Sequence, residues 1–457
     1  MALNALDRHV ALVGFMGAGK TTLVAPLKAR LGRGGLDLDA DASSVIAERG
    51  LAAFRKLEED YTTDWLERRT PAVYGLGGGA VMSADVRDSL RANAFTILLP
   101  VDVKTAWQRV HGSDRPLARD EGEFRRLYDE RQATYREVAD AVADDLDGAT
   151  LAAAGVHHEP GSLERLGELV PGDGPVALVA DSTVLRIHGA RAQDALGARL
   201  VSTHELPPGE EAKQLRVVER LWSELTLDRS GTVVALGGGS VTDTTGFAAA
   251  TYLRGVPWVA VPTTLVGQVD AAIGGKTAID TSQGKNLAGS FHWPARVVID
   301  EMLLETLPER EQRQGLAELV KTRLLAGAEL DVRGAAAYKA ALCLRDPHDR
   351  GVRQWLNLGH TFAHALEAAA GFELPHGDAV ALGLVAALRL SGRDTSVLDE
   401  LDPSPVSVDR DRAWEALLRD KKRTGDAINL VLLGDDGPRL EARPANEVRA
   451  ALDTLIA

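Results

Sequence analysis

A glycine loop near the amino terminus constrains the first part of the chain more than any other feature. The stretch HVALVGFMGAGKTTLVAPLKARLG (9–32) runs from an apolar segment typical of a buried strand, through the loop, into an amphipathic helix. It fits G-x-x-x-x-G-K-[ST], in which backbone N–H groups and a helix N-terminus surround phosphates, the lysine reaches the terminal phosphates and the hydroxyl meets Mg²⁺. The sequence therefore predicts a nucleoside triphosphate site, with Mg²⁺ at Thr21, formed by Gly14, Gly17, Gly19, Lys20, Thr21 and Thr22.

Length, charge and cysteine content narrow what the rest of the chain can be. A chain of 457 residues exceeds one ordinary hydrophobic core and predicts about two or three domains. The net charge of −14 argues against nucleic acid or an anionic membrane as a partner. No secretion signal and no bilayer-spanning apolar run is visible, and the single cysteine, Cys343, excludes an internal disulfide framework. We therefore expect a cytoplasmic protein.

Charged motifs follow the glycine loop. LDLDADASS places three aspartates at a predicted strand end, AFRKLEE places Arg55 and Glu58 on one helical face, and a triglycine turn, GLGGGAV, follows an apolar strand. Arginines recur in DRPLARD and DERQATYREVAD. In this order and spacing, residues 8–140 resemble shikimate kinase, a P-loop domain with a parallel sheet.

This resemblance implies ATP and shikimate as ligands. The residues implied for the carboxylate and hydroxyls of shikimate are Arg55, Arg131 and the backbone around Gly78 and Gly79, with Arg115 on a lid over ATP. An aspartate would serve as base or hydroxyl anchor. The segment before Arg55 is shorter than in the family, so Asp37/Asp39 and Asp39/Asp41 both remain candidate pairs, with Asp39 common to the two.

The pattern of strand, glycine turn and helix starts again after an Ala/Asp/Gly-rich stretch near 145–160. PVALVAD is an apolar strand ending in Asp181, a position typical of a ribose anchor, and TVVALGGGSVTDTTGF predicts a strand, a second triglycine turn and a helix. The layout suits the pyrophosphate of a dinucleotide, with Asp243 and the hydroxyls of Thr263 and Thr264 close to it. No other motif recurs at the 160-residue offset between the triplets, so the chain is not an internal repeat.

Basic residues framed by glycines follow the second triplet. Lys276 lies in GGKT, and Lys285 and Asn286 lie in GKN. Glycines allow a ligand to approach the backbone closely. These polar positions within eleven residues predict a pocket for an anion.

A carboxylate and several histidines predict a metal site further along the chain. GLAELVKTRLLAG predicts a helix with Glu318 and Lys321 at i, i+3, and RQWLNLGHTFAHALEAAAG predicts another with His360 and His364 at i, i+4. His376 directly precedes a third apolar helix. One Glu and two or three His on separate helices suit Zn²⁺, or Co²⁺, with positions left open for substrate.

Together these motifs resemble 3-dehydroquinate synthase across residues 165–435. The resemblance implies a bound NAD, one divalent metal, and a homodimer in which Arg254 reaches the neighbouring subunit's site. The implied metal ligands are Glu318, His360 and His376. The implied substrate residues are Lys276, Asn286, Arg254 and Lys421 or Lys422 at the phosphate, Arg353 at the carboxylate, and Asp270, Lys321, Lys339, Asn357 and His364 at the ring hydroxyls. The implied NAD contacts are Asp181, Glu210, Lys213, Gly238, Gly239, Asp243, Thr263, Thr264, Lys285 and Thr306.

We expect an α/β fold in three domains. Residues 1–150 would form the P-loop kinase domain, residues 160–300 a Rossmann-like NAD-binding domain, and residues 301–457 a mainly helical domain that binds metal and substrate. Three residues depart from the synthase pattern: Thr242 replaces a glycine, and Asp349 and Asp378 replace glutamates. They bear on substrate choice more than on the class of reaction.

The two resemblances predict a bifunctional enzyme of aromatic amino-acid biosynthesis. The synthase half would convert 3-deoxy-D-arabino-heptulosonate 7-phosphate into 3-dehydroquinate and phosphate, and the kinase half would phosphorylate shikimate with ATP. Three alternatives stay open at this point: a glycerol-dehydrogenase-like polyol oxidoreductase, another sugar-phosphate cyclase, and a kinase domain that binds ATP without catalysis.

Overall fold

The computed structural model describes residues 3–38, 42–113, 116–420 and 427–457. The chain divides into two compact units, Met1–His157 and His158–Ala457, which are described separately below. Several residues singled out from the sequence lie outside the described residues, namely Asp39, Asp41, Arg115, Lys421 and Lys422.

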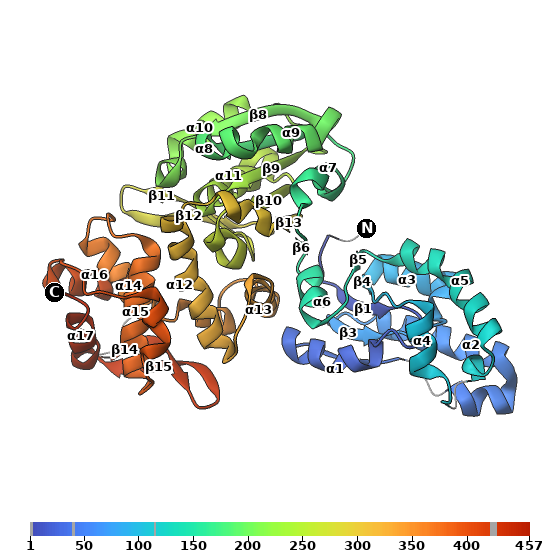
Figure 1. The fold of residues 1–457 in the computed structure, drawn as a ribbon. Coiled ribbons are helices and arrows are strands. Elements are labelled where there is room, and N and C mark those ends of the chain that lie inside the picture. Colours follow the sequence, from blue (N-terminus) through green and yellow to red (C-terminus); the bar gives the residue numbers. More distant parts are fainter. Residues whose placement is uncertain (1–2, 39–41, 114–115, 421–426) are drawn as a thin grey trace. The chain divides into compact units, whose positions relative to one another are not determined.

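The first unit is built on a five-stranded sheet with the order β2-β3-β1-β4-β5 (Figure 1). All its strand pairs among the described residues are parallel, and the HVALV strand is buried along its whole length, which explains its continuous apolar sequence. The strands are β1 (His9–Val13), β2 (Gly34–Asp37), β3 (Ala72–Gly75), β4 (Ala94–Leu98) and β5 (Ala141–Val142). The helices are α1 (Lys20–Leu31), α2 (Ala42–Leu66), α3 (Ala84–Asn93), α4 (Val103–Val110), α5 (Glu121–Val138) and α6 (Leu146–Ala153).

The strand order places the first glycine loop at the centre of this sheet. β1 lies between β3 and β4, so the chain leaves β1 where the order of the strands reverses. Open parallel sheets bind ligands beyond the carboxyl ends of their strands at such a point. The glycine loop after β1 and the triglycine turn after β3 therefore share one edge of the sheet.

The second unit begins with a six-stranded sheet of order β6-β13-β10-β9-β7-β8. Strands β8, β7, β9, β10 and β13 pair in parallel, and β7, β9 and β10 are buried throughout. The strands are β6 (Val156–His158), β7 (Val176–Asp181), β8 (Leu200–Leu206), β9 (Thr232–Gly237), β10 (Trp258–Pro262) and β13 (Arg296–Ile299), with an antiparallel hairpin of β11 (Lys276–Thr281) and β12 (Gly284–Phe291). The helices here are α7 (Leu166–Leu169), α8 (Ser182–Val184), α9 (Ala190–Leu196), α10 (Leu215–Glu224) and α11 (Gly239–Thr251).

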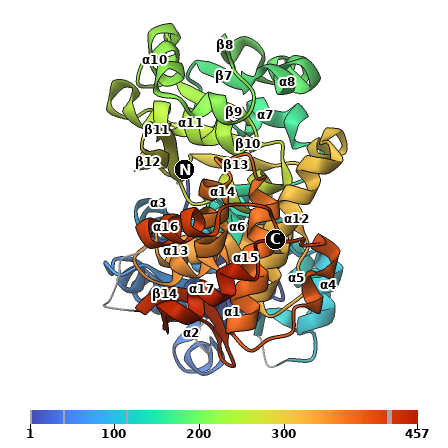
Figure 2. The ribbon, with the colours of Figure 1, turned by 90° about the vertical axis from the view of Figure 1, so that its left-hand side faces the viewer.

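A mainly helical part completes the second unit, with its own hydrophobic core. Figure 2 shows α14, α15, α16 and α17 gathered below the sheet that contains β7, β9 and β10. The long helix α12 packs against both α13 and α15 (Figure 1). The elements are α12 (Glu309–Ala326), α13 (Val332–Arg345), α14 (His360–Ala369), α15 (His376–Leu390), α16 (Arg410–Asp420), the hairpin β14 (Ala427–Gly434) and β15 (Gly437–Pro444), and α17 (Ala445–Asp453).

The expected α/β class with parallel sheets and a helical carboxyl-terminal part is confirmed. One helix prediction was wrong at its start. The helix expected over 353–371 begins only at His360, and residues 352–357 form a 3-10 helix. Between the two, Gly359 adopts φ 78, where a Cβ would lie 2.9 Å from the backbone of Gly383. No helix of the described residues is long and apolar enough to cross a membrane.

Candidate functional site

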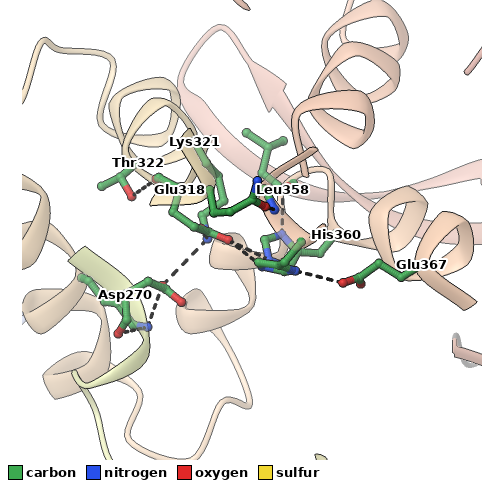
Figure 3. Close-up of polar contacts among 11 residues, drawn as sticks. Asp270, Glu318, Lys321, Thr322, Leu358, His360 and Glu367 are labelled. Atoms are coloured by element: carbon green, nitrogen blue, oxygen red, sulfur yellow. Dashed lines mark hydrogen bonds and ion pairs between the residues drawn. The ribbon is translucent and has the colours of Figure 1, made fainter. Parts of the chain in front are cut away.

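Three helices bring one carboxylate and two imidazoles together in the second unit. Glu318 lies inside α12, while His360 and His376 are the first residues of α14 and α15. Glu318 Oε1 lies 3.3 Å from His360 Nε2 and 3.2 Å from His376 Nε2. The close-up in Figure 3 shows these contacts converging on the Glu318 carboxylate.

The spacing of these atoms fits a divalent metal. The three ligand atoms all lie within 4.8 Å of one another. Nitrogen and oxygen ligands about 2.0–2.1 Å from a tetrahedral zinc ion are themselves roughly 3.3 Å apart, which matches the two distances from Glu318. Two histidines and one carboxylate also form a donor set used by catalytic zinc sites, in which the fourth position is left for water or substrate.

Lys321, one turn along α12, forms an ion pair with Glu318. Both side chains are 1% exposed, so each charge depends on the other. Burial alone would raise the pKa of Glu318, but Lys321 and His360 hold that pKa well below its usual value. Burial lowers the pKa of His360, whereas hydrogen bonds from His376 to Glu318 and Glu367 outweigh burial and raise the pKa of His376 to about 10.

Asp270 links this cluster to the next group of cations. It lies in a π-helix over residues 267–271, a rare form that often occurs at functional sites. Its carboxylate accepts a 2.6 Å hydrogen bond from Lys339 Nζ and lies 3.9 Å from Lys321 Nζ. Burial would raise the pKa of Asp270, but Lys339 and Lys321 lower it. The adjacent Ala271 lies beside the second triglycine turn, because a Cβ added at Gly239 would meet its side chain at 3.3 Å.

The segment 346–353, a loop followed by the start of the 3-10 helix Val352–Asn357, carries two more of the predicted residues. Asp349 forms an ion pair with Lys276 at the start of β11, and Arg353 is 2% exposed and donates to the carbonyl of Pro347. The carboxylate of Asp346 accepts three backbone N–H groups of this loop, including that of Arg353 at 3.2 Å. Asn357 ends that 3-10 helix.

The predicted dinucleotide residues gather around the turn from β9 into α11. Lys213 Nζ donates to Asp243 at 2.7 Å and also to the side-chain oxygen of Asn286. Burial would lower the pKa of Lys213, but Asp243 raises it. Glu210 accepts from Ser240 at 3.0 Å and lies 3.6 Å from Lys285 Nζ.

Other predicted dinucleotide contacts have structural partners of their own. Asp181 caps α8 by accepting from the N–H groups of Thr183 and Val184. Thr264 Oγ1 accepts from Gly267 N at 3.1 Å, and Thr263 is buried. Thr306 Oγ1 lies 2.9 Å from His188 Nε2.

Arg254 is not brought to these residues. It is exposed at the end of the 3-10 helix Tyr252–Arg254 that follows α11, and no contact among the described residues joins it to Glu318, His360, His376 or Lys276. Leu253 and Arg254 both have positive φ, 50 and 69. Such conformations are costly for residues with large side chains and cluster at functional sites.

In the first unit the glycine loop has the expected form. Gly14, Gly17 and Gly19 have φ of 147, 80 and 92, which favours glycine at each position. Lys20 is 6% exposed and donates to the carbonyls of Gly14 and Phe15 at 2.7 and 3.2 Å. Thr21 and Thr22 lie exposed in the first turn of α1.

Two guanidinium groups meet the first triglycine turn. Arg55 forms an ion pair with Glu58, and a Cβ at Gly79 would overlap the Arg55 guanidinium. Arg131 is 5% exposed and donates to the carbonyl of Gly78 at 2.9 Å. Burial, and to a smaller extent the charge of Arg55, lower the pKa of Arg131. The turn therefore contacts two guanidinium groups, that of Arg131 at Gly78 and that of Arg55 at Gly79.

Comparison with known proteins supports the same division. The shikimate kinase family model matches residues 16–154, and the amino- and carboxyl-terminal models of 3-dehydroquinate synthase match residues 203–314 and 297–423. The 3-dehydroquinate synthase of Bordetella pertussis is 38% identical over 340 residues, which cover 65% of this chain and 95% of that protein. The chain belongs to the 3-dehydroquinate synthase family. Its first unit is a shikimate kinase domain.

Solved structures of cyclases resemble the synthase part. A 2-deoxy-scyllo-inosose synthase complexed with carbaglucose-6-phosphate, NAD⁺ and Co²⁺ is 25% identical with a TM-score of 0.59, covering 65% of this chain and 95% of the other. A 2-epi-5-epi-valiolone synthase from Streptomyces hygroscopicus, with NAD⁺ and Zn²⁺ bound, is 26% identical with a TM-score of 0.55, covering 66% and 96%. These similarities favour the synthase over a polyol oxidoreductase.

Two acidic residues of the synthase were not predicted from the sequence, although each contacts a predicted site residue or its backbone. Asp346 organises the loop of Arg353, and Glu367 contacts His376 at 3.3 Å. Glu367 lies seven residues after His360 on α14, so helical periodicity places it on the face of the histidine. No comparable spacing signal exists for Asp346, because its partners are backbone groups.

Substituting one of the three expected metal ligands tests whether that residue contributes to metal binding while its neighbour on the same helix does not. We expect His360→Ala to weaken zinc binding by more than the roughly 10–100-fold that loss of an outer-shell partner costs. His364→Ala serves as the matched control, since its ring lies 5.5 Å from that of His360 and it is not among the three clustered ligands. Zinc content after gel filtration and competition with a chromogenic chelator measure both variants. Equal zinc loss in the two would contradict the assignment.

Proposed function

We propose that the second unit converts 3-deoxy-D-arabino-heptulosonate 7-phosphate into 3-dehydroquinate and phosphate. The observation that supports this most is the continuity between the dinucleotide turn and the metal ligands. Ala271 lies against Gly239, and its neighbour Asp270 contacts Lys339 and Lys321, which pairs with Glu318. A dinucleotide on the turn and a metal on Glu318 would therefore act on one substrate.

The donor set suits Zn²⁺ or Co²⁺, held by Glu318, His360 and His376. When bound, NAD would supply reversible hydride acceptance, and the metal would supply polarisation of the reacting carbinol oxygen. The chain's own contribution is orientation, because a substrate held rigidly can undergo elimination and ring closure in one site. Lys321 and His364 lie beside the metal ligands and are placed to hold or move protons at the substrate hydroxyls.

The substrate's two anionic ends require cations. Lys276 and the exposed Arg254 are proposed for the phosphate, together with Lys421, and the buried Arg353 for the carboxylate. The ion pair between Lys276 and Asp349 orients the lysine until an anion competes for it. Asn286, bonded to Lys213, would connect the phosphate pocket with the dinucleotide residues.

A purified-protein assay tests the reaction of the second unit. We expect phosphate release from the heptulosonate phosphate, no net accumulation of NADH, and loss of turnover on chelation that Zn²⁺ or Co²⁺ restores. Phosphate release without any effect of chelation would contradict the metal's role. Net NADH formation from a polyol, with no phosphate released, would instead favour the dehydrogenase alternative, and turnover of a different heptulose phosphate would favour another cyclase.

We propose that the first unit phosphorylates shikimate with ATP. The supporting observation is the pair of guanidinium groups at the first triglycine turn. Among the described residues, Arg55 forms an ion pair with Glu58 and Arg131 forms none, so a carboxylate ligand would balance the second guanidinium. ATP and Mg²⁺ would occupy the loop of Lys20 and Thr21, with Asp37 or Asp39 as base or hydroxyl anchor.

Gly79→Ala tests the acid-binding part of the kinase. The added Cβ would displace the Arg55 guanidinium, and loss of one charged hydrogen bond costs about 1.5–3 kcal/mol, so we expect shikimate to bind at least about ten-fold more weakly. ATP affinity should stay unchanged. Gly34→Ala is the control, because a Cβ there meets nothing within 4 Å. Calorimetric titration with each ligand measures the effect, and unchanged shikimate affinity would refute the assignment. Absence of phosphorylation in the wild type, with ATP still bound, would favour the non-catalytic alternative.

We propose that the synthase acts as a homodimer in which Arg254 completes the partner's site. The support is its exposure on the strained Leu253-Arg254 backbone, away from the other substrate residues of its own chain.

Co-expression of two inactive variants tests this dimer. We expect Arg254→Ala and Lys321→Ala to be inactive alone, and their random mixture to regain about a quarter of wild-type turnover, since half of the dimers are mixed and each holds one intact site. Mixing the separately purified variants without subunit exchange is the control. A mixture as inactive as its components would place Arg254 in its own chain's site.

A further inference from the structure

The two histidines of the metal group differ in what their second ring nitrogen contacts. Both present Nε2 to Glu318, so both turn Nδ1 away from it. His360 Nδ1 lies 3.2 Å from the backbone carbonyl of Leu358, whereas His376 Nδ1 lies 3.3 Å from the carboxylate of Glu367 (Figure 3). A carbonyl or carboxylate can only accept, so each contact places a proton on Nδ1, and Nε2 is the nitrogen that would lose its proton and bind a metal shared with Glu318.

Glu367 is an unusual residue to bury. It is 6% exposed on α14, and no lysine or arginine among the described residues forms an ion pair with it. Its one described side-chain hydrogen bond is to His376. Buried carboxylates without a partner are costly, and they are kept where they pair with a charge or with a metal ligand. Burial would raise the pKa of Glu367, but His376 and, to a smaller extent, the charges of His364 and Lys285 lower it.

We propose that Glu367 is a positioning residue for the metal, acting through His376. This inference rests on the metal site proposed above. The carboxylate holds the Nδ1–H tautomer, orients the ring so that Nε2 faces Glu318, and makes the imidazole a stronger ligand. It also supplies the second negative charge beside a divalent cation, the first being Glu318. His360 needs no such side chain, because the backbone of Leu358 performs the same orientation.

The geometry of α14 explains why the contact depends on Glu367. The helix presents His360, His364 and Glu367 along one face, at intervals of four and three residues. His376 is the first residue of α15, and its side chain is 39% exposed, so packing alone does not hold the ring. A hydrogen bond from the neighbouring helix is therefore the restraint that the ring requires.

Metal binding to the full chain, stripped with a chelator and titrated with Zn²⁺ or Co²⁺, tests the inference. We expect Glu367→Gln to raise the dissociation constant about 10–100-fold, the usual cost of losing an outer-shell partner. Glutamine can still accept from Nδ1–H, so Glu367→Ala should lose more, and Glu367→Asp should recover part of the affinity. Glu373→Gln removes the same charge from an exposed position in the following loop and should leave binding unchanged.

Two further measurements separate positioning from a merely structural role. We expect the visible absorption spectrum of the Co²⁺-loaded protein to change in Glu367→Gln. We also expect the rise in Tm on adding Zn²⁺ to shrink while the Tm of the metal-free protein stays close to that of the wild type. Wild-type affinity and an unchanged cobalt spectrum in Glu367→Gln would overturn the inference, and an equal fall in both Tm values with normal affinity would assign Glu367 to stability alone. A wild-type chain that binds neither metal would instead refute the proposed metal site.

Discussion

One buried carboxylate joins the helical part of the synthase. Glu318 contacts Lys321 on its own helix and the Nε2 atoms of His360 and His376 on two others. A charge that is 1% exposed is tolerated only with such partners, so the positions of α12, α14 and α15 all depend on it. Both histidines are the first residues of their helices, so each imidazole projects from a helix start, directly after backbone that is not helical. The clustering of these polar side chains and the packing of three helices thus have a common origin.

Glycines make the close packing around Glu318 feasible. A Cβ at Gly359, directly before the first histidine, would meet the backbone of Gly383 on α15 at 2.9 Å. A Cβ at Gly377, directly after the second, would meet the backbone of Gln314 on α12. Each glycine therefore lets two helix backbones approach more closely than a side chain permits. These two glycines therefore help to bring the imidazoles of His360 and His376 to the Glu318 carboxylate.

Sequence patterns predicted most helices and strands, because period and spacing depend on a single element. The meeting of Glu318, His360 and His376 joins three helices, and it was expected from the family resemblance rather than from spacing. The start of the helix at His360 was missed, because the turn before it is set by a contact with another helix rather than by local composition. The pairs Lys213–Asn286 and Lys276–Asp349 were also not predictable, since each joins positions 73 residues apart, and the lysines were expected to hold ligands directly. In both pairs the lysine already has a partner, so a ligand must exchange with it rather than meet a free cation.

The two triglycine turns have similar local sequences, but different groups pack against them. At residues 77–79 the last glycine makes room for the guanidinium of Arg55, and the carbonyl of the middle one accepts from Arg131. At residues 237–239 the middle glycine makes room for the side chain of Thr264, and the last lies close to the π-helix that carries the acidic residue of the site. The first turn thus admits charged side chains, whereas the second admits small uncharged side chains of neighbouring segments beside a helix start. Substituting alanine in the first should disturb an anion site, while the same change in the second should disturb the packing on which the dinucleotide turn rests.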